Sequence, residues 1–333
     1  MKTTSVMLQT LCVPCQCRCR YCLLSWAGQT VGADYDRCER LAARFHDWIG
    51  QERPDLSFNF SFGYSMEHPR LFDALRFLNS IGSVTGEFLQ CDGLRFRTDD
   101  EIETLLSGLG DCGVKHLNFT FYGTRDDHDR FAARKGDFDF MLRLLSRAAA
   151  HGFETSAGMP LTRENAAQAG TLYESLAERG ADRITPFVPH AEGRGALLDP
   201  IRLTQTDYDS LDTPVRQRLN RERYRTEAEW LALKDWNEPQ RRSLLISLTP
   251  ENITRYEDAP FDEIIAEVER LDEAYYAALP SYEALAARYG NPEGDCFYGR
   301  RDLFARYQKA FIREHRLALY DVTDERFSGS RRF

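Results

Sequence analysis

The sequence has little that would place the protein in a membrane or on nucleic acid. It contains no run of 18 apolar residues, which excludes a helix that crosses a bilayer, and its start lacks the long apolar segment of an export signal. Acidic residues outnumber basic ones by 52 to 43, and a net charge of −9 disfavours a nucleic-acid partner. We therefore expect a cytoplasmic protein with no membrane association.

Cysteine is scarce outside one short segment. The chain has nine cysteines, an odd count that argues against a disulfide framework in the absence of an export signal. Beyond residue 112 there is only Cys296. Five fall within eleven residues, namely Cys12, Cys15, Cys17, Cys19 and Cys22. Because clustered thiols in a reducing compartment more often bind metal, this segment is predicted to be a metal centre.

Hydrophobic periodicity predicts an α/β fold. Short apolar or alternating segments indicate strands at about 5–11, 56–62, 87–91, 115–121, 153–158 and 183–188. Amphipathic helices are predicted between them at 35–50, 69–80, 99–109, 137–151 and 165–180. This alternation indicates a parallel sheet, either open and doubly wound or closed as a barrel, and it is short of the roughly 250 residues of a complete eight-unit barrel. After residue 195 the alternation stops, so residues 196–333 are predicted to form a mostly helical extension or lid.

Three of the clustered cysteines have the spacing C-x3-C-x2-C, at positions 15, 19 and 22. A short irregular loop can wrap three thiolates around one edge of an iron–sulfur cluster, which leaves one iron without a protein ligand. A four-thiolate zinc site drawn from the same five cysteines is the alternative. No second C-x2-C or H-x3-H pair follows this loop, and such a pair is what a zinc knuckle usually requires.

With aromatic Tyr21 before the last cysteine, the segment resembles the signature C-x3-C-x-Φ-C of the radical S-adenosylmethionine (SAM) superfamily, which lies after the first strand of a partial (βα)6, TIM-like barrel. The resemblance implies a 4Fe-4S cluster held by Cys15, Cys19 and Cys22, with SAM on the open iron. It implies an enzyme that cleaves SAM reductively and abstracts hydrogen from a peptide or small-molecule substrate. An electron donor such as flavodoxin or ferredoxin is implied as a partner.

Further cofactor contacts follow from the same resemblance. Residues 62–64 stand where the superfamily carries a Gly-Gly-Glu segment that binds the SAM amino group, and residues 90–93 resemble its Thr-Asn-Gly turn. Residues 120–123 are similar to a segment of the peptide-modifying (SPASM/twitch-type) subgroup. The implied cofactor contacts are Tyr21, Phe62, Gly63, Tyr64, Asp92, Thr120, Tyr122, Ser156, Phe187 and Val188. That subgroup often binds auxiliary clusters, for which this chain lacks cysteines.

Two other functions stay open at this point. The departure at Phe62 to Tyr64 from the superfamily's pattern leaves room for a non-catalytic binding or scaffold protein that keeps the cluster and the fold. The five-cysteine loop leaves room for a zinc or thiol-redox protein. The sequence identifies neither catalytic residues nor the substrate and the reaction type.

Overall fold

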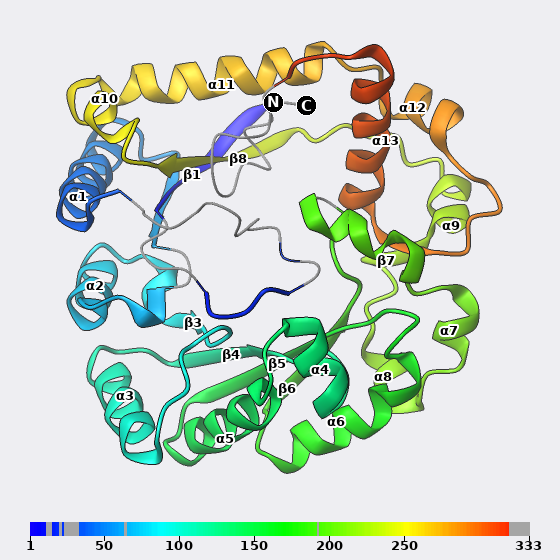
Figure 1. Cartoon of the computed structure of the whole chain (residues 1–333). Helices are drawn as coiled ribbons and strands as arrows, with labels where there is room; N and C mark the ends of the chain where they lie inside the picture. Colours follow the sequence, from blue (N-terminus) through cyan, green and yellow to red (C-terminus); the bar gives the residue numbers. More distant parts are fainter. Residues whose placement is uncertain (11–14, 20–21, 23–32, 63–64, 192, 320–333) are drawn as a thin grey trace.

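The computed structural model describes residues 1–10, 15–19, 22, 33–62, 65–191 and 193–319 (Figure 1). The strands are β1 (Lys2–Thr10), β2 (Ser57–Ser61), β3 (Phe88–Gln90), β4 (His116–Thr120), β5 (Glu154–Pro160), β6 (Arg183–Phe187), β7 (Tyr224–Thr226), β8 (Arg241–Leu248) and β9 (Phe297–Gly299). The helices are α1 (Tyr35–Glu52), α2 (Leu71–Ser80), α3 (Asp99–Asp111), α4 (Arg125–Ala132), α5 (Asp137–Ala150), α6 (Ala169–Glu178), α7 (Gln205–Asp209), α8 (Thr213–Arg218), α9 (Glu227–Ala232), α10 (Ile253–Asp258), α11 (Phe261–Ala277), α12 (Tyr282–Tyr289) and α13 (Arg300–His315). Short 3-10 turns are η1 (Ser65–Glu67), η2 (Val84–Gly86), η3 (Ala166–Gln168) and η4 (Gly193–Ile201).

Two parallel sheets form the barrel wall. One has the strand order β2-β1-β8 and the other β3-β4-β5-β6. In the described residues β2 and β3 are not hydrogen bonded to each other, and the turn η2 joins their sheets. There the N–H of Phe60 on β2 donates to Ser83 Oγ at 3.2 Å, just before η2. The structure therefore confirms an α/β fold with a partial, TIM-like barrel and a helical extension.

The six strands and five helices predicted from periodicity all form, within a few residues of the expected ends. Helix α3 illustrates the local cause. Thr98 Oγ1 accepts from the N–H of Glu101, and Glu101 accepts from the N–H of Thr98 at 2.8 Å. This capping box satisfies two orphan donors and contributes about 1 kcal/mol to helix stability.

The main hydrophobic core lies between the strands and the helices that cover them. It includes fully buried residues on inward helix faces and on both sheets, among them Leu8, Phe45, Leu75, Leu117 and Leu145. Within the described part of the chain, no helix is long and apolar enough to cross a membrane.

The extension contributes more to the barrel than expected. The sequence analysis placed no strand after residue 195, yet β8 pairs in parallel with β1 from Lys2↔Arg241 to Thr10↔Leu248. The strand was missed because one of its buried positions holds Arg242, a charged residue that breaks the apolar alternation. Arg242 is only 6% exposed and its Nη1 lies 3.1 Å from Asp272 on α11, whose side chain is fully buried.

Two cores divide the extension. Strand β8 and helices α10 and α11 pack into the main core, through residues such as Leu244, Ile253 and Val268. Helices α12 and α13 instead form a separate aromatic cluster, in which the rings of Tyr282 and Phe304 stack at 4.1 Å. The predicted division into residues 1–195 and 196–333 stays a prediction, and β8 shows that the two parts share one sheet.

Candidate functional site

A cavity of about 1200 Å³ lies inside the barrel and is enclosed by the strands of the wall. Residues of β1, β3, β4, β5, β6 and β8 line it, and the extension closes one side through β7 and α13. Four thiols reach this cavity, those of Cys15, Cys17, Cys19 and Cys22. In a parallel α/β fold, ligands bind at the carboxyl ends of the strands, and the cysteines follow the carboxyl end of β1.

Backbone hydrogen bonds fix the cysteine segment to two neighbouring elements. The N–H of Gln16 donates to Gly93 O at 2.8 Å, just after β3. The N–H of Arg18 donates to Ala132 O at 2.8 Å, at the end of α4. The turn is closed on its far side by the N–H of Cys22, which donates to Cys19 O at 3.2 Å. These contacts hold Cys15 and Cys19 at the mouth of the barrel.

Gly93 makes the approach of Cys15 possible. Its φ of +72° is a left-handed conformation that favours glycine, and a Cβ at this position would lie 1.8 Å from Cys15 Sγ. Any side chain here would therefore occupy the space of the cysteine thiol. The turn at residues 90–93 thus acts as a seat for the first cysteine.

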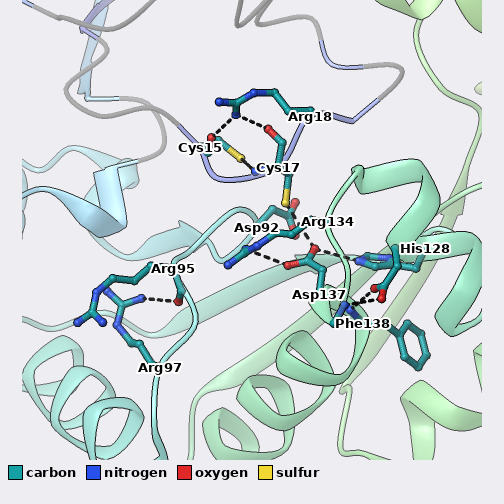
Figure 2. Close-up of polar contacts among 12 residues, drawn as sticks. Cys15, Cys17, Arg18, Asp92, Arg95, Arg97, His128, Arg134, Asp137 and Phe138 are labelled. Atoms are coloured by element: carbon teal, nitrogen blue, oxygen red, sulfur yellow. Dashed lines mark hydrogen bonds and ion pairs between the residues drawn. The ribbon is translucent and has the colours of Figure 1, made fainter.

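Cys17 is the unexpected member of this loop. The sequence analysis assigned it no ligand role, and the structure buries it at 3% exposure with its Sγ donating to Asp137 at 3.4 Å (Figure 2). Hydrogen bonds with the thiols of Cys15 and Cys19 lower the pKa of Cys17 well below its usual range. The same hydrogen bonds, followed by burial, raise the pKa of Cys15 and of Cys19.

A buried polar network lies beneath Cys17. The carboxylate of Asp137, at the start of α5, accepts from Arg134 Nη1 at 2.9 Å and contacts His128 Nε2 at 3.1 Å (Figure 2). His128 Nδ1 accepts from the N–H of Tyr122 at 3.1 Å, so the proton of the neutral imidazole is assigned to Nε2. Burial raises the pKa of Asp137. The network joins α4, α5 and the cysteine loop.

Polar side chains form a row across the second sheet. Gln90, Asn118, Ser156 and Arg183 occupy paired positions on β3, β4, β5 and β6, and all four line the cavity. Asn118 donates to Gln90 Oε1, and Ser156 Oγ donates to Asn118 Oδ1 at 2.6 Å. This row gives the cavity a polar floor beneath the carboxyl ends of the strands.

Asp92 stands above this row. Its Oδ1 accepts from the N–H of Thr120 at 2.8 Å, and its Oδ2 accepts from Gln90. Burial raises the pKa of Asp92 to about 7, against the opposing effect of the hydrogen bonds from Thr120. A carboxyl group held in this way can accept hydrogen bonds from a polar cofactor at the barrel mouth.

The structure brings part of the predicted set to the cavity. Lining residues include Cys15, Cys19, Cys22, Asp92, Thr120, Ser156 and Phe187. It does not bring Phe62, Tyr122 and Val188 there, since all three are buried away from the cavity lining at 3%, 3% and 1% exposure. The predicted contacts Tyr21, Gly63 and Tyr64 lie outside the described residues.

The side chain of Tyr122 has structural partners instead. Its ring stacks on Phe131 with centroids 3.6 Å apart, and its hydroxyl group lies 2.6 Å from Thr162 Oγ1. Alternation along a strand explains the difference, because Thr120 and its neighbour two positions on share a face only while the strand continues. Strand β4 ends at Thr120, so the two-residue alternation of the strand does not determine the direction of the Tyr122 side chain.

Sequence reasoning missed several lining residues. Gln90 and Asn118 belong to strands that were predicted correctly, and their polar character on an inward face was the available signal. His190, in the segment after β6, also lines the cavity, with Nδ1 3.1 Å from Asp302 on α13. Seven lining arginines were missed because most come from the extension, where no strand was predicted.

The thiols suit the iron–sulfur cluster that the cysteine spacing implies. Cys15, Cys17 and Cys19 are close enough to share hydrogen bonds, and neighbouring thiols resist losing all their protons unless a cation balances the charge. Among the described residues, no group of three or more histidine, cysteine, aspartate or glutamate side chains is arranged so that it could hold a metal ion. The ligand assignment to Cys15, Cys19 and Cys22 therefore stays a prediction.

Comparisons with known proteins agree with this geometry. The family model of the radical SAM superfamily matches residues 12–176. SuiB of Streptococcus suis, solved with its precursor peptide SuiA, is similar in fold at 11% identity and a TM-score of 0.50, covering 78% of this chain and 62% of that one. Coproporphyrinogen III oxidase (HemN) from Escherichia coli, a radical SAM enzyme, gives 16% identity and a TM-score of 0.41 over 65% of this chain and 50% of that one.

The chain spans less than two thirds of the length of either of these structures. No curated protein matches it. The family match begins within the cysteine segment and extends through strand β5, the part of the barrel that carries the cysteines and most of the polar row. On this match, the chain belongs to the radical SAM superfamily through residues 12–176, and the shared fold agrees with it.

Proposed function

We propose that the protein holds a 4Fe-4S cluster through Cys15, Cys19 and Cys22, cleaves SAM reductively, and abstracts a hydrogen atom from a peptide or small-molecule substrate. One observation carries the proposal: the three thiols and the polar ends of β3, β4 and β5 face one cavity of about 1200 Å³. That volume exceeds the roughly 300–1000 Å³ of a typical small-molecule pocket, so it leaves room for a substrate beside SAM.

Each part of the cavity has a role in this proposal. When bound, the cluster supplies the electron that breaks a carbon–sulfur bond of SAM. Asp92 and Thr120 lie where they would hold the polar groups of SAM, and Ser156 lies one row deeper. Phe187 offers an apolar surface at the end of β6. The cavity walls would shield bound SAM and substrate from water, which is the protein's share of such chemistry.

An electron donor such as flavodoxin or ferredoxin completes the proposal. The cluster would have to receive one electron for each SAM cleaved. The cysteine segment lies at the mouth of the barrel and not within its core, since its backbone bonds to the ends of β3 and α4. This position supports reduction by a protein that docks over the loop.

The test is an anaerobic reconstitution with iron and sulfide. Wild-type protein is expected to bind about four iron atoms and to form 5′-deoxyadenosine and methionine from SAM under reduction. Cys15→Ala, Cys19→Ala and Cys22→Ala should each lose iron and cleavage. Cys296→Ala is the matched control, because this thiol lies in the extension and does not line the cavity. A wild-type protein with an intact cluster that neither binds nor cleaves SAM would overturn the proposal.

A zinc site is the second candidate, favoured by the fourth thiol that the structure adds to the cavity. Cys17 lies within hydrogen-bonding distance of Cys15 and Cys19, so four thiols could surround one zinc ion. The variant Cys17→Ser separates the two. A cluster held by three cysteines keeps its iron in this variant, whereas a four-thiolate site loses its zinc. Purified protein with one zinc and no labile sulfide would decide for the second candidate.

A further inference from the structure

The cavity has a charge bias opposite to that of the whole chain. Its described lining contains seven arginines and one carboxylate, Asp92, although acidic residues outnumber basic ones across the sequence. A cavity lined by one sign of charge concentrates ligands of the other sign. The charge of the lining is therefore evidence about the charge of the ligand that enters the cavity.

Three of these arginines are already paired. Arg242 bonds to Asp272 on α11, and Arg300 lies 3.2 Å from Asp235. Arg301 also has a partner. The carboxylates balance the positive charge of Arg242 and Arg300, so these two arginines are not available to bind a ligand at full strength.

The other four arginines have no acidic partner among the described residues. We call this set the arginine rim, and its members are Arg183, Arg218, Arg223 and Arg241. All four are exposed and line the cavity. Arg218 and Arg223 rest on aromatic rings, those of Tyr173 at 4.8 Å and Tyr224 at 5.3 Å. Such stacking holds a guanidinium group in place and leaves N–H donors for an anion, although Arg218 Nη1 also donates to Pro214 O at 3.2 Å.

The arginine rim lies along the two edge strands of the barrel wall. Strands β6 and β8 are the outer strands of the two sheets and are not hydrogen bonded to each other in the described residues. Arg183 is the first residue of β6, and Arg241 is the first residue of β8. Arg218 and Arg223 come from the segment between these strands in sequence, which packs on the same side (Figure 1). The positive charge therefore lies at the amino ends of β6 and β8, at the end of the cavity away from the cysteine segment.

One member of the arginine rim also lies close to the proposed SAM position. Arg183 closes the polar row that runs from Gln90 through Asn118 and Ser156. This row lies two residues, or roughly 7 Å, below Asp92 and Thr120. A substrate anchored at Arg183 would thus lie next to the proposed SAM position and would not be held at a remote surface.

From these observations we infer that the substrate is a polyanion, whose carboxylate or phosphate groups bind the arginine rim while its reacting carbon points toward the cysteine loop. Arginine's planar guanidinium group matches both kinds of anion through paired hydrogen bonds. The inference rests on the proposed function, because it names what that cavity takes besides SAM. An acidic peptide segment and a small polyanionic metabolite share this chemistry.

The test measures binding of two probes to the reconstituted protein in the presence of SAM, by calorimetry at low salt. The probes are a hexaglutamate peptide and pyrophosphate. Wild-type protein should bind at least one of them, and the variant Arg223→Gln/Arg241→Gln should bind it at least tenfold more weakly. Preference for the peptide identifies an acidic peptide as the source, and preference for pyrophosphate identifies a small metabolite.

The control is Arg179→Gln/Arg270→Gln, which removes the same charge from two exposed arginines outside the cavity. It should bind as the wild type does. Equal binding by the rim variant, or no binding of either probe by the wild type, overturns the inference. Formation of 5′-deoxyadenosine is measured in all three proteins, so that loss of SAM cleavage in the wild type is recognised as a failure of the proposed function. Arg183→Gln provides a second, independent rim variant.

Discussion

The contact between Gly93 and Cys15 gives the sharpest test of the site. In Gly93→Ala the new Cβ would lie 1.8 Å from Cys15 Sγ. Nonbonded atoms pack at about 3.5–4.0 Å, so the sulfur has to move by roughly 2 Å. Metal–ligand distances tolerate only about 0.2 Å. The substitution should therefore prevent Cys15 from reaching the cluster.

The same substitution also strains the backbone, and this effect has to be separated. A left-handed conformation costs a residue with a side chain about 1–2 kcal/mol. Gly152→Ala carries this cost alone, because Gly152 has a φ of +84° and nothing within 4 Å of the new Cβ. For domains of 150–250 residues, each kcal/mol lowers Tm by about 2–4 °C. Both variants should lose a few degrees in Tm.

Iron and labile sulfide are measured after anaerobic reconstitution of both variants. Gly152→Ala should hold as much iron as the wild type, and Gly93→Ala should lose most of it. Full iron in the Gly93→Ala protein, with a Tm equal to that of the Gly152→Ala protein, would show that Cys15 is not a ligand in the position described here.

Two further substitutions test the support of the barrel and the limits of the site. Arg242→Met should lower the free energy of unfolding by about 3–5 kcal/mol in urea titrations, because it leaves Asp272 buried without its ion pair. The control is Arg255→Met, which removes the exposed ion pair with Glu267. It should lower the free energy of unfolding by less than about 1 kcal/mol. A small effect at Arg242 would mean that β8 does not depend on this pair. Tyr122→Phe should lower the free energy of unfolding by about 1 kcal/mol, because it removes the hydrogen bond to Thr162. The Kd for SAM should not change. A Kd that is tenfold weaker would place Tyr122 at the cofactor.

The barrel strands were predictable because their own residues carry the signal. Strands β1 to β6 have apolar or alternating segments bounded by turns, and Thr98 marks the start of α3. The cysteine spacing likewise needs no partner elsewhere in the chain to be recognised. Local patterns of this kind survive in a single sequence, which is why the fold class and the thiol set were predicted together.

Other features depend on contacts between distant segments and left no local signal. The buried Arg242 looks unsuited to a strand of the core until Asp272, thirty residues later, is seen beside it. Cys17 looks dispensable until Asp137, from α5, is found against its sulfur. The placement of Tyr122 away from the cavity lining depends on where β4 ends, and strand ends are the least predictable part of a pattern.

The site divides along the chain in a way that bears on substrate choice. The family match ends at residue 176, and it contains the cysteines, Asp92, Thr120 and Ser156. Every member of the arginine rim lies beyond it, on β6, in the segment before β7, or on β8. The residues proposed to hold the cluster and SAM thus lie in the part of the chain that the family model matches. If the rim binds the substrate, the specificity of this enzyme is carried by residues 183–241, and changes confined to that range should alter which anion binds without altering iron content.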